Sequence, residues 1–365
     1  MKILILDDYA NYGGVSKASE ALANLLSEVD QNIERKSIHA EQNSIFSKIK
    51  SLFLAFIFLL LSRHEKIILM HFDAILIGAF CRLFKKDNLF INVVHTDLYG
   101  YYCTSSTLKK TIIRTLFFIL KNDPIVFVSK EAAARAVDFF GFTNTTVIYN
   151  AITPPPPRTV ELKSQDAQVL LACVSRLHPT KNIDLLIRVF DSFWASHPHV
   201  TLAIFGSGSE NEKLKTYAQQ FQSSNSIEFK GYMSDPEKIY QGLDGVVSLS
   251  SIEGFPLIAV EAASRNIPVL HSDCSCGPRE ILNPLSDPRI KTDQYELCTA
   301  GVLVALPSAI TPFAPSLQQN EENLLDAFQV FYQHLNQMKK SNKNTTLELF
   351  SRPVICKQWI TLLNN

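Results

Sequence analysis

The stretch from residue 245 to residue 282 constrains the fold of this chain more than any other. It contains two short apolar runs, residues 245–249 and 267–271, separated by a loop and a helical pattern that begins near Pro256. Apolar runs of this length, bounded by turn residues, are typical of buried strands. A strand, a helix and a second strand in this order predict an α/β unit built on a parallel sheet.

Two carboxylates flank the start of that helix. Glu253 lies in the loop after the first strand, and Glu261 lies two turns farther along. Because a helix has about 3.6 residues per turn, we expect both carboxylates to face one crevice. Between them, the backbone N–H groups of Phe255 and Leu257, beside Pro256 at the helix start, are open to an anion. The pattern suits a nucleotide sugar, although a solvated glutamate and a helix-capping glutamate explain the spacing equally well.

The same run resembles the signature of a known enzyme family. The sequence EGFPL at residues 253–257, followed by Glu261, is similar to the E-x₇-E motif of family 4 retaining glycosyltransferases, which belong to the group 1 glycosyltransferases. The resemblance implies the GT-B fold, an α/β architecture of two facing Rossmann-like domains with parallel sheets. It places Glu253 by the transferred sugar and Glu261 on the ribose. The residues of this run that it places around the donor are Glu253, Gly254, Phe255, Pro256, Leu257 and Glu261.

Length and a proline run predict where the two domains meet. A chain of 365 residues is long for one core. Residues 153–157, TPPPP, form a stiff, extended segment that cannot join a sheet. We therefore predict a first domain over residues 1–152, a linker over 153–166 and a second domain over 167–349. The resemblance adds a final helix, residues 350–365, that crosses back to the first domain.

Charge, cysteines and hydropathy exclude several classes of protein. Basic and acidic residues number 35 each, so the chain has no general field for nucleic acid. Its seven scattered cysteines predict no disulfide framework and favour a reducing cytosol. Cys274 and Cys276 lack a second pair at zinc spacing, so we predict no metal there. The longest apolar run, residues 52–61, has about half the length that spans a bilayer, so we predict no transmembrane helix, and the cysteines make the predicted location cytoplasmic.

An adjacent pair of glycines follows the first predicted strand, residues 2–6. Gly13 and Gly14 stand at the start of an amphipathic helical pattern, where glycine lets a phosphate approach the backbone. A tight turn explains two adjacent glycines about as often. Family 4 members carry a similar Gly-Gly loop here, so the resemblance implies contact with the donor.

A histidine follows another predicted strand of the first domain. His95 comes directly after the apolar run of residues 89–94, at the strand end where α/β folds place ligands. Such a histidine can also satisfy a hydrogen bond in the core. In the family, a histidine at the matching strand end lies by the transferred sugar, and the resemblance gives His95 that catalytic role.

Two cations follow the first predicted strand of the second domain, residues 168–174. Arg176 and Lys181 flank a turn that leads into an amphipathic helix. Fixed cations at such a turn can hold a diphosphate and neutralise its charge as a leaving group, and solvated surface cations are the alternative. The run SRLHPTKN, residues 175–182, is similar to the family's S-R-L-x₃-K-N pattern. The resemblance thus implies a catalytic role for both cations.

A G-x-G turn, Gly206 to Gly208, follows the next strand of the second domain. The third glycine of the dinucleotide fingerprint would fall at Asn211, so that fingerprint fails and argues against a dehydrogenase. Family members have a similar turn beside the nucleotide, which implies that Gly206 contacts it. By resemblance alone, the loop with Tyr232 and Met233 contacts a uracil edge.

Apolar stretches of helix length lie among basic residues between residues 45 and 86. Residues 1–150 contain 17 Lys or Arg against 14 Asp or Glu. Helices with basic outer faces, packed on a sheet, explain this pattern. The alternative is peripheral contact with an anionic membrane, in which nearby apolar side chains enter the lipid. That contact would place the chain on the inner face of the cytoplasmic membrane, beside lipid-linked acceptors.

The resemblance also implies a reaction. A hexose or N-acetylhexosamine passes from a nucleoside-diphosphate sugar, UDP-linked, to a glycan or lipid-linked acceptor with retention at the anomeric carbon. The products would be lipopolysaccharide, capsule or related bacterial surface polysaccharide, because the run from residue 272 to 281 is similar to that subset of the family. No D-x-D occurs in the sequence, so Arg176, Lys181 and helix dipoles would replace a metal ion, and we expect no cofactor.

Two other functions fit the same two-domain plan. A non-hydrolysing UDP-sugar epimerase would consume the donor without any acceptor. A non-catalytic nucleotide-sugar-binding partner would bind UDP and never turn over. The intact set of Arg176, Lys181, Glu253 and Glu261 disfavours the non-catalytic partner.

Overall fold

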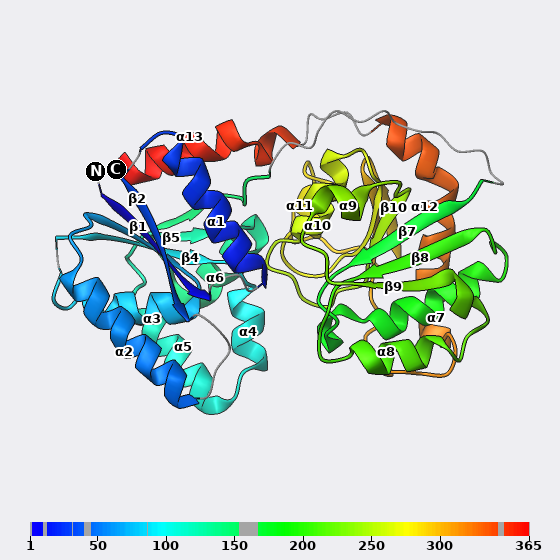
Figure 1. Cartoon of the computed structure of the whole chain (residues 1–365), viewed down its shortest axis with the longest axis horizontal. Coiled ribbons are helices and arrows are strands. Elements are labelled where there is room, and N and C mark those ends of the chain that lie inside the picture. The colour runs from blue at the N-terminus through cyan, green and yellow to red at the C-terminus, as the bar shows by residue number, and fades with distance from the viewer. Residues whose placement is uncertain are drawn as a thin grey trace. The chain divides into compact units, whose positions relative to one another are not determined.

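The structure is a computed structural model, and it divides the chain into two compact units. The first unit consists of Met1–Thr153 and Leu349–Asn365, and the second of Pro154–Glu348 (Figure 1). The last helix, α13 (Arg352–Asn364), therefore belongs to the first unit. The predicted linker, residues 153–166, lies outside the described residues. The structure describes residues 2–9, 13–30, 32–39, 45–85, 87–152, 167–341 and 347–364.

Parallel strands form the sheet of the first unit, in the order β2-β1-β3-β4-β5-β6 among the described residues. The strand predicted at residues 89–94 is confirmed as β4, and the apolar residues of β3 and β4 are buried between helices. β2 escaped prediction because it is a polar edge strand in which half-buried and exposed residues alternate. The strands are β1 (Ile3–Tyr9), β2 (Ile33–His39), β3 (Lys66–Met70), β4 (Leu89–Val94), β5 (Ile125–Phe127) and β6 (Thr145–Val147).

Helices cover both faces of this sheet. Figure 1 shows α1 and α13 on one face and α2, α3 and α5 on the other. Local signals fix their ends: the Ser129 side chain accepts a hydrogen bond from the Ala132 N–H at the start of α6, and Gly141 ends that helix with a φ of 70°. The helices are α1 (Gly13–Ser27), α2 (Ile45–Leu61), α3 (Phe72–Cys81), α4 (Leu98–Thr104), α5 (Thr107–Ile119), α6 (Lys130–Phe140) and α13.

The sheet of the second unit has the order β12-β13-β11-β10-β7-β8-β9. The strand predicted at residues 168–174 is confirmed as β7, and the apolar runs at residues 245–249 and 267–271 contain or overlap β10 and β11. The short edge strand β12 is antiparallel to β13, which departs from the expected parallel sheet. The strands are β7 (Val169–Val174), β8 (Val200–Phe205), β9 (Ile227–Gly231), β10 (Gly245–Ser248), β11 (Val269–Ser272), β12 (Tyr295–Cys298) and β13 (Gly301–Val304).

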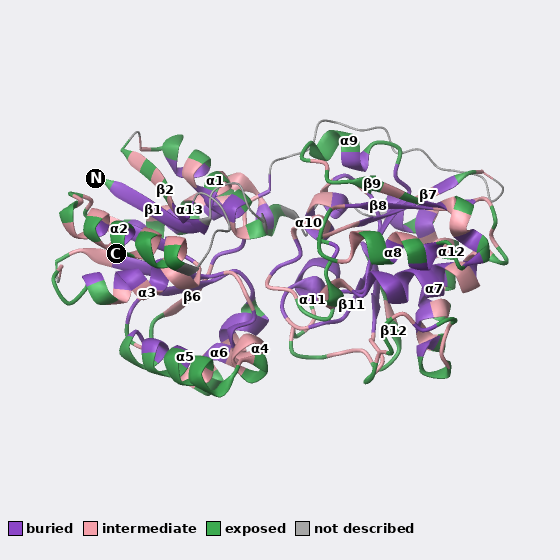
Figure 2. Cartoon of the chain, turned by 60° about the horizontal axis from the view of Figure 1, so that its bottom comes forward, coloured by how far each residue is buried: buried purple, intermediate pink, exposed green. Residues whose placement is uncertain are grey.

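A buried ion pair fixes two helices of the second unit against each other. Arg188, in α7, is fully buried, and its Nη2 lies 2.6 Å from Oε1 of Glu321, which directly precedes α12. A 3₁₀ turn, Gln319–Glu321, precedes α12. Figure 2 shows β8 and β11 of this unit largely buried and the outer surface of α8 exposed. The helices are α7 (Ile183–Trp194), α8 (Asn211–Ala218), α9 (Pro236–Tyr240), α10 (Leu257–Ser264), α11 (Pro278–Leu282) and α12 (Glu322–Ser341).

Each sheet has one point where the direction of strand addition reverses. In the first unit the reversal falls between β1 and β3, because β2 lies on one side of β1 and the later strands lie on the other. In the second unit it falls between β7 and β10 for the same reason. Open α/β sheets bind ligands outside the carboxyl ends of their strands at such switch points. The loops after these four strands are therefore the places to look for a site.

Candidate functional site

Two loops of the second unit meet at the switch point between β7 and β10. The loop after β7 contains Lys181, and the loop after β10 contains Glu253. Asn182 joins them, because its Nδ2 donates to the Leu249 carbonyl and to the Ser251 hydroxyl, both at 2.7 Å. Asn182 has a φ of 49°, a left-handed conformation that asparagine tolerates better than most residues. The two loops are therefore fixed against each other.

Lys181 and Glu253 form an ion pair at this point. Lys181 Nζ lies 2.6 Å from Glu253 Oε1, and both side chains are largely buried. Burial alone would raise the pKa of Glu253, but Lys181, His271 and Ser250 outweigh it and lower that pKa below its usual range. Glu253 is therefore a carboxylate near neutral pH. Sequence analysis assigned these two residues to different parts of the donor and missed their contact.

His271 is a second residue that sequence analysis missed. It lies in β11, fully buried, and its Nδ1 is 2.8 Å from the Ser272 carbonyl oxygen, so Nδ1 is the donor. Its Nε2 atom is buried without a hydrogen-bond partner among the described residues. Burial lowers the pKa of His271, with Glu253 opposing that shift. A neutral imidazole thus lies beside the ion pair, and its only sequence signal was its place at a strand end.

The start of α10 follows directly on this loop, near Pro256 as predicted. No side chain of the described residues caps it, which leaves the predicted anion cradle to backbone groups. Within the predicted cradle Phe255 is buried, whereas Gly254 and Leu257 are half-buried. Gly277, with a φ of 112°, supports the turn so closely that a Cβ atom on it would lie 2.5 Å from Pro256 Cδ.

Glu261 has a different partner from Glu253. It lies in the second turn of α10, half-buried, and the Tyr240 hydroxyl donates to its Oε2 at 2.8 Å. Burial, reinforced by Glu261, raises the pKa of Tyr240 well above its usual value, so the phenol keeps its proton. The guanidinium of Arg265 lies 4.8 Å from the centre of the Tyr240 ring. No contact joins the two glutamates in the part of the chain that the structure describes.

The glycines of the G-x-G turn have a packing role that sequence analysis did not anticipate. Gly206 has a φ of 137°, and a Cβ atom on it would lie 1.8 Å from the Ser175 carbonyl oxygen. A Cβ atom on Gly208 would lie 2.2 Å from the Leu177 carbonyl oxygen. Only glycine allows this approach of two loops.

Arg176 lies in the sequence between Ser175 and Leu177, the two residues that these glycines contact. Its side chain is exposed and forms no ion pair among the described residues.

Tyr232 and Met233 follow β9, next to that turn. The Gly206 N–H donates to the Gly231 carbonyl at 2.8 Å, so the loops after β8 and β9 are joined. Tyr232 is exposed and Met233 half-buried. The structure thus brings the predicted residues of the second unit to one edge of its sheet, with Arg176, Lys181 and Glu253 near the switch point.

The glycine pair of the first unit forms the first turn of α1. Gly14 is exposed, and a Cβ atom on it would meet no atom within 4 Å. Packing therefore does not require glycine at residue 14, in contrast to Gly206. The assignment of Gly13 and Gly14 to the donor stays a prediction.

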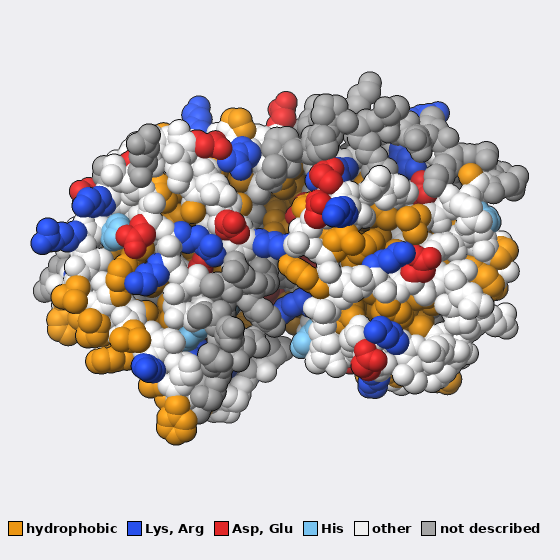
Figure 3. Space-filling view, viewed as in Figure 1, with side chains coloured by type: hydrophobic (Ala, Val, Ile, Leu, Met, Phe, Trp, Pro, Cys, Tyr) orange, Lys and Arg blue, Asp and Glu red, His pale blue; other side chains and the backbone are white. Residues whose placement is uncertain are grey.

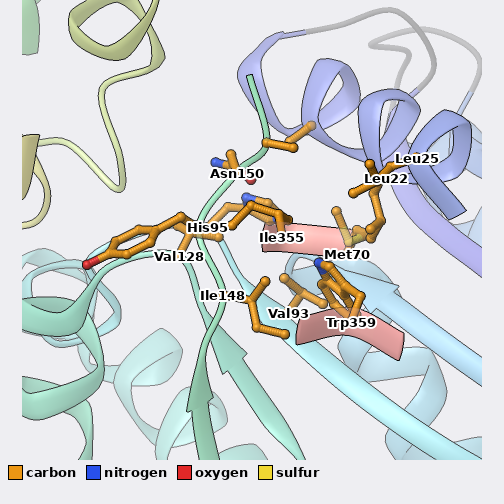
Figure 4. Close-up of a pocket in the computed structure, with 13 residues that line it drawn as sticks. Leu22, Leu25, Met70, Val93, His95, Val128, Ile148, Asn150, Ile355 and Trp359 are labelled. Atoms are coloured by element: carbon orange, nitrogen blue, oxygen red, sulfur yellow. The ribbon is translucent and has the colours of Figure 1, made fainter. Parts of the chain in front are cut away.

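His95 lines a small cavity of the first unit (Figure 4). The cavity, about 20 Å³, has room for about one water molecule and none for a sugar. Burial, with a smaller contribution from His71, lowers the pKa of His95 to about 3, so the ring is neutral. Its Nε2 atom is buried without a partner among the described residues. Ile355 and Trp359 of α13 close another side of this cavity.

Two observations on metals and membranes concern both units, within the residues that the structure describes. Among the described residues, no group of three or more His, Cys, Asp or Glu side chains is placed to hold a metal ion. Within the same residues, every helix is too short or too polar to cross a membrane. Whether transfer needs a metal stays a prediction.

Known proteins resemble parts of this chain in sequence. Residues 159–293, which include the Lys181–Glu253 pair, match the family model of glycosyl transferases group 1. The lipopolysaccharide 1,6-galactosyltransferase of Salmonella typhimurium is 31% identical over 166 residues, 43% of this chain and 44% of that protein. The poly(ribitol-phosphate) alpha-N-acetylglucosaminyltransferase of Staphylococcus aureus is 25% identical over 225 residues, 60% of this chain and 45% of that protein. Matches span 27% to 54% of the lengths of five such curated relatives.

Solved structures resemble the whole chain. HepE of Anabaena, solved with UDP and glucose, superposes with a TM-score of 0.71 over 100% of both chains at 16% identity. The lipopolysaccharide outer core galactosyltransferase WaaB, in its apo form, gives 0.64 over 100% of this chain and 99% of WaaB at 16% identity. The chain therefore has the GT-B fold, as predicted. The segment that matches the group 1 glycosyltransferase model lies within the range 159–293, and the named relatives are transferases.

Proposed function

We propose that this chain is a family 4 retaining glycosyltransferase that transfers a hexose or N-acetylhexosamine from a UDP-sugar to a glycan or lipid-linked acceptor. The observation that carries the proposal is the Lys181–Glu253 pair, because it places a cation and a carboxylate together at a switch point inside the matched segment. A UDP-linked donor is supported by HepE, which was solved with UDP and glucose and with UDP-glucose.

The donor's diphosphate would bind at the cationic loop after β7. Exposed Arg176 and the N-terminus of α10 would neutralise the phosphates as they bind and as they leave. Lys181 would serve twice, because it holds Glu253 in place and stays within reach of a phosphate. The carboxylate of Glu253 would then stabilise positive charge that develops at the anomeric carbon.

The nucleoside would bind farther along the same sheet edge. Glu261, oriented by Tyr240, has one carboxylate oxygen held at 2.8 Å and the other available for ribose hydroxyls. The loop with Tyr232 and Met233, joined to Gly206 through Gly231, would contact the base. Gly13 and Gly14 would contact the donor from the first unit.

The transfer step we propose is a same-face substitution. The acceptor hydroxyl oxygen bonds to the anomeric carbon while the bond from that carbon to the leaving phosphate oxygen breaks. The leaving phosphate oxygen takes the proton of the acceptor hydroxyl, so the products are the glycoside and UDP. Arg176 and Lys181 stabilise the charge that collects on that phosphate, in place of a metal ion.

The acceptor would belong to a bacterial surface glycan, such as lipopolysaccharide or capsule. This part of the proposal is supported by the relatives, whose names include a lipopolysaccharide galactosyltransferase and a poly(ribitol-phosphate) transferase. Such acceptors are built at membranes, and we propose that the chain works on the inner face of the cytoplasmic membrane.

One face of α2 supports the membrane contact. Its exposed apolar side chains recur at helical spacing, and exposed Lys50 lies among them. Figure 3 shows apolar side chains gathered over this part of the first unit. Monomeric soluble proteins rarely expose apolar patches of this kind without a partner. We define the α2 face as Phe46, Ile49, Phe53, Leu54, Ile57 and Leu61, together with Phe80 of α3 and Leu83 and Phe84 after it.

A screen of nucleotide sugars tests the proposed function. We expect one UDP-sugar to raise the thermal unfolding midpoint more than its ADP and GDP counterparts, because a ligand that binds only the folded state stabilises it. That UDP-sugar should release UDP only when an acceptor is present. Consumption of the donor without acceptor would indicate an epimerase, and stabilisation without any turnover would indicate a non-catalytic binding partner. Absence of stabilisation by every nucleotide sugar would refute all three functions.

A further inference from the structure

The switch point of the first unit holds an acid–base pair that none of the preceding assignments uses. Asp8 lies near the carboxyl end of β1, and His71 directly follows β3, the neighbouring strand. His71 Nδ1 lies 2.8 Å from Asp8 Oδ2, although 63 residues separate them in the chain. The pair therefore spans the point where an α/β sheet binds ligands.

Asp8 is held in one position by several donors. It is buried, and its carboxylate accepts hydrogen bonds from the backbone N–H groups of Ala74 at 2.9 Å and Asp73 at 3.3 Å, at the start of α3. Because a carboxylate only accepts hydrogen bonds, the proton between the pair is on His71 Nδ1. In the neutral ring, Nε2 is then an acceptor whose direction is fixed by Asp8.

His71 adopts a backbone conformation that is almost confined to glycine. Its φ is 83° and its ψ is −179°. The Val93 carbonyl, which accepts from the His71 N–H at 3.1 Å, holds the residue there, and the Phe72 ring packs edge-on with ring centres 6.0 Å apart. A non-glycine residue is strained in this region, and such strain concentrates at ligand sites. A position that favours glycine yet carries histidine indicates a use for the imidazole.

The free edge of this imidazole is accessible. The His71 side chain is 30% exposed, and Nε2 has no hydrogen-bond partner among the described residues. The neighbouring charge of Asp8 disfavours a phosphate or carboxylate at Nε2, whereas a hydroxyl can donate to it. The chemistry of the pair therefore fits a sugar or polyol hydroxyl.

We propose that His71, oriented by Asp8, binds a hydroxyl of the acceptor through Nε2 and positions it for transfer. This inference rests on the proposed function, because the phosphates of the donor are assigned to the second unit. His71 takes no proton in it, since the proton of the acceptor hydroxyl goes to the leaving phosphate.

Two substitutions of His71 test the roles of its two ring nitrogens separately. In His71→Asn the amide can replace Nδ1 and keep the hydrogen bond to Asp8, but no atom reaches the position of Nε2. In His71→Gln the amide oxygen can reach the position of Nε2, but the hydrogen bond to Asp8 is lost. We expect His71→Asn to raise the acceptor KM at least tenfold, and His71→Gln to recover part of that loss. The donor KM and the affinity for UDP should change less than threefold in both variants.

A binding measurement without turnover keeps this inference separate from the proposed function. In protein labelled with ¹⁵N-histidine, the Nε2 resonance of His71, assigned by its loss in His71→Asn, should shift when a lipopolysaccharide core oligosaccharide or a poly(ribitol phosphate) oligomer is added. UDP alone should leave it unchanged. If transfer fails but this shift appears, the proposed function is wrong and the acceptor site stands. A folded His71→Asn protein with an unchanged acceptor KM, or an Nε2 resonance that responds to UDP rather than to acceptor, overturns the inference.

Discussion

Lys181 Nζ lies 2.6 Å from Glu253 Oε1, and the two residues follow neighbouring strands, β7 and β10, whose loops Asn182 joins. The carboxylate is thus held by a cation that also belongs to the proposed diphosphate site. Removal of its charge should affect the chemical step more than the binding of the nucleotide.

For Glu253→Gln we therefore expect a kcat lower by roughly 100-fold, because a group that stabilises charge only in the transition state contributes about that much. UDP affinity, measured by calorimetry, should change less than about threefold, since the amide leaves the phosphate ligands in place. Asp287→Asn, an exposed acid distant in sequence, is the control. Near-normal turnover by Glu253→Gln would remove the central assignment.

Glu261 and Tyr240 provide a test of the ribose site. Glu261→Ala should weaken UDP binding by about 1–3 kcal/mol, the contribution of a hydrogen bond to a charged group, and leave kcat at saturating donor nearly unchanged. Tyr240→Phe keeps the carboxylate and removes the hydrogen bond that orients it at 2.8 Å, so a smaller loss is expected. If Glu261 only anchors Tyr240, both variants will lower the free energy of unfolding while the UDP affinity stays as in the wild type.

His95 should make the stability of the chain depend on pH. Burial lowers its pKa to about 3, from an ordinary value of 6.5. Between these values the unfolded chain binds a proton that the folded chain does not, so the free energy of unfolding falls as the pH drops through this window. One such histidine contributes a slope of about 1.4 kcal/mol per pH unit.

The variant His95→Leu should flatten that slope. Urea unfolding at several pH values between about 4.5 and 7 measures it for both proteins. Buried His271, whose pKa is also lowered, leaves a residual slope in the variant and serves as an internal reference. Parallel stability profiles would show that His95 does not titrate as described.

Donor binding and transfer should survive EDTA. The phosphates are expected to meet Arg176, Lys181 and the N-terminus of α10 rather than a divalent ion. Transfer rates with EDTA and with added Mg²⁺ or Mn²⁺ should agree within about twofold, because no metal ion contacts the phosphates in this arrangement. Complete loss of transfer in EDTA that only Mg²⁺ or Mn²⁺ restores would refute the metal-independent mechanism.

We expect the chain to bind anionic membranes through the α2 face. We expect co-flotation with liposomes that contain anionic lipid, at low salt, and weaker flotation with neutral liposomes. The double variant Phe53→Ser and Ile57→Ser should lose most of this binding. Leu285→Ser, which changes an apolar side chain of the second unit that is 98% exposed, is the matched control and should float like the wild type. A wild-type chain that stays at the bottom of the gradient contradicts the membrane contact.

Sequence analysis placed most of the candidate residues of the second unit in short loops after strongly apolar strands, and the structure brings those loops to one edge of the sheet. It could not predict which side chains pair. Lys181 and Glu253 are 72 residues apart, and Glu261 and Tyr240 are 21 apart, so their contacts depend on which strands become neighbours. Helical spacing predicted a shared crevice for the two glutamates, whereas the structure gives each its own partner.

Sequence analysis also failed to predict the edge strands and the strained backbone conformation of His71. β2 and β12 lie at sheet edges, where exposed residues alternate with half-buried ones, so they lack the apolar runs that identified β4 or β10. His71 carried no signal because its backbone conformation is imposed by contacts with β1 and β4. The glycines of the G-x-G turn suggested a ligand, and their close contacts with Ser175 and Leu177 show that packing also requires glycine there. Contact of Gly206 with the nucleotide stays a prediction.

The position of α13 sets an order of events during synthesis. This helix lies against α1 in the first unit, where Ile355 and Trp359 meet Leu22 and Leu25, but the ribosome makes it after the whole second unit. At translation rates of about 5–20 residues per second, the intervening chain takes roughly 10–40 s to appear. During that interval the apolar side of α1 is exposed to solvent, because α13 has not yet been synthesised. We expect chains stalled before residue 349 to be cleaved by protease near α1 far faster than the released protein, and equal cleavage rates would contradict this.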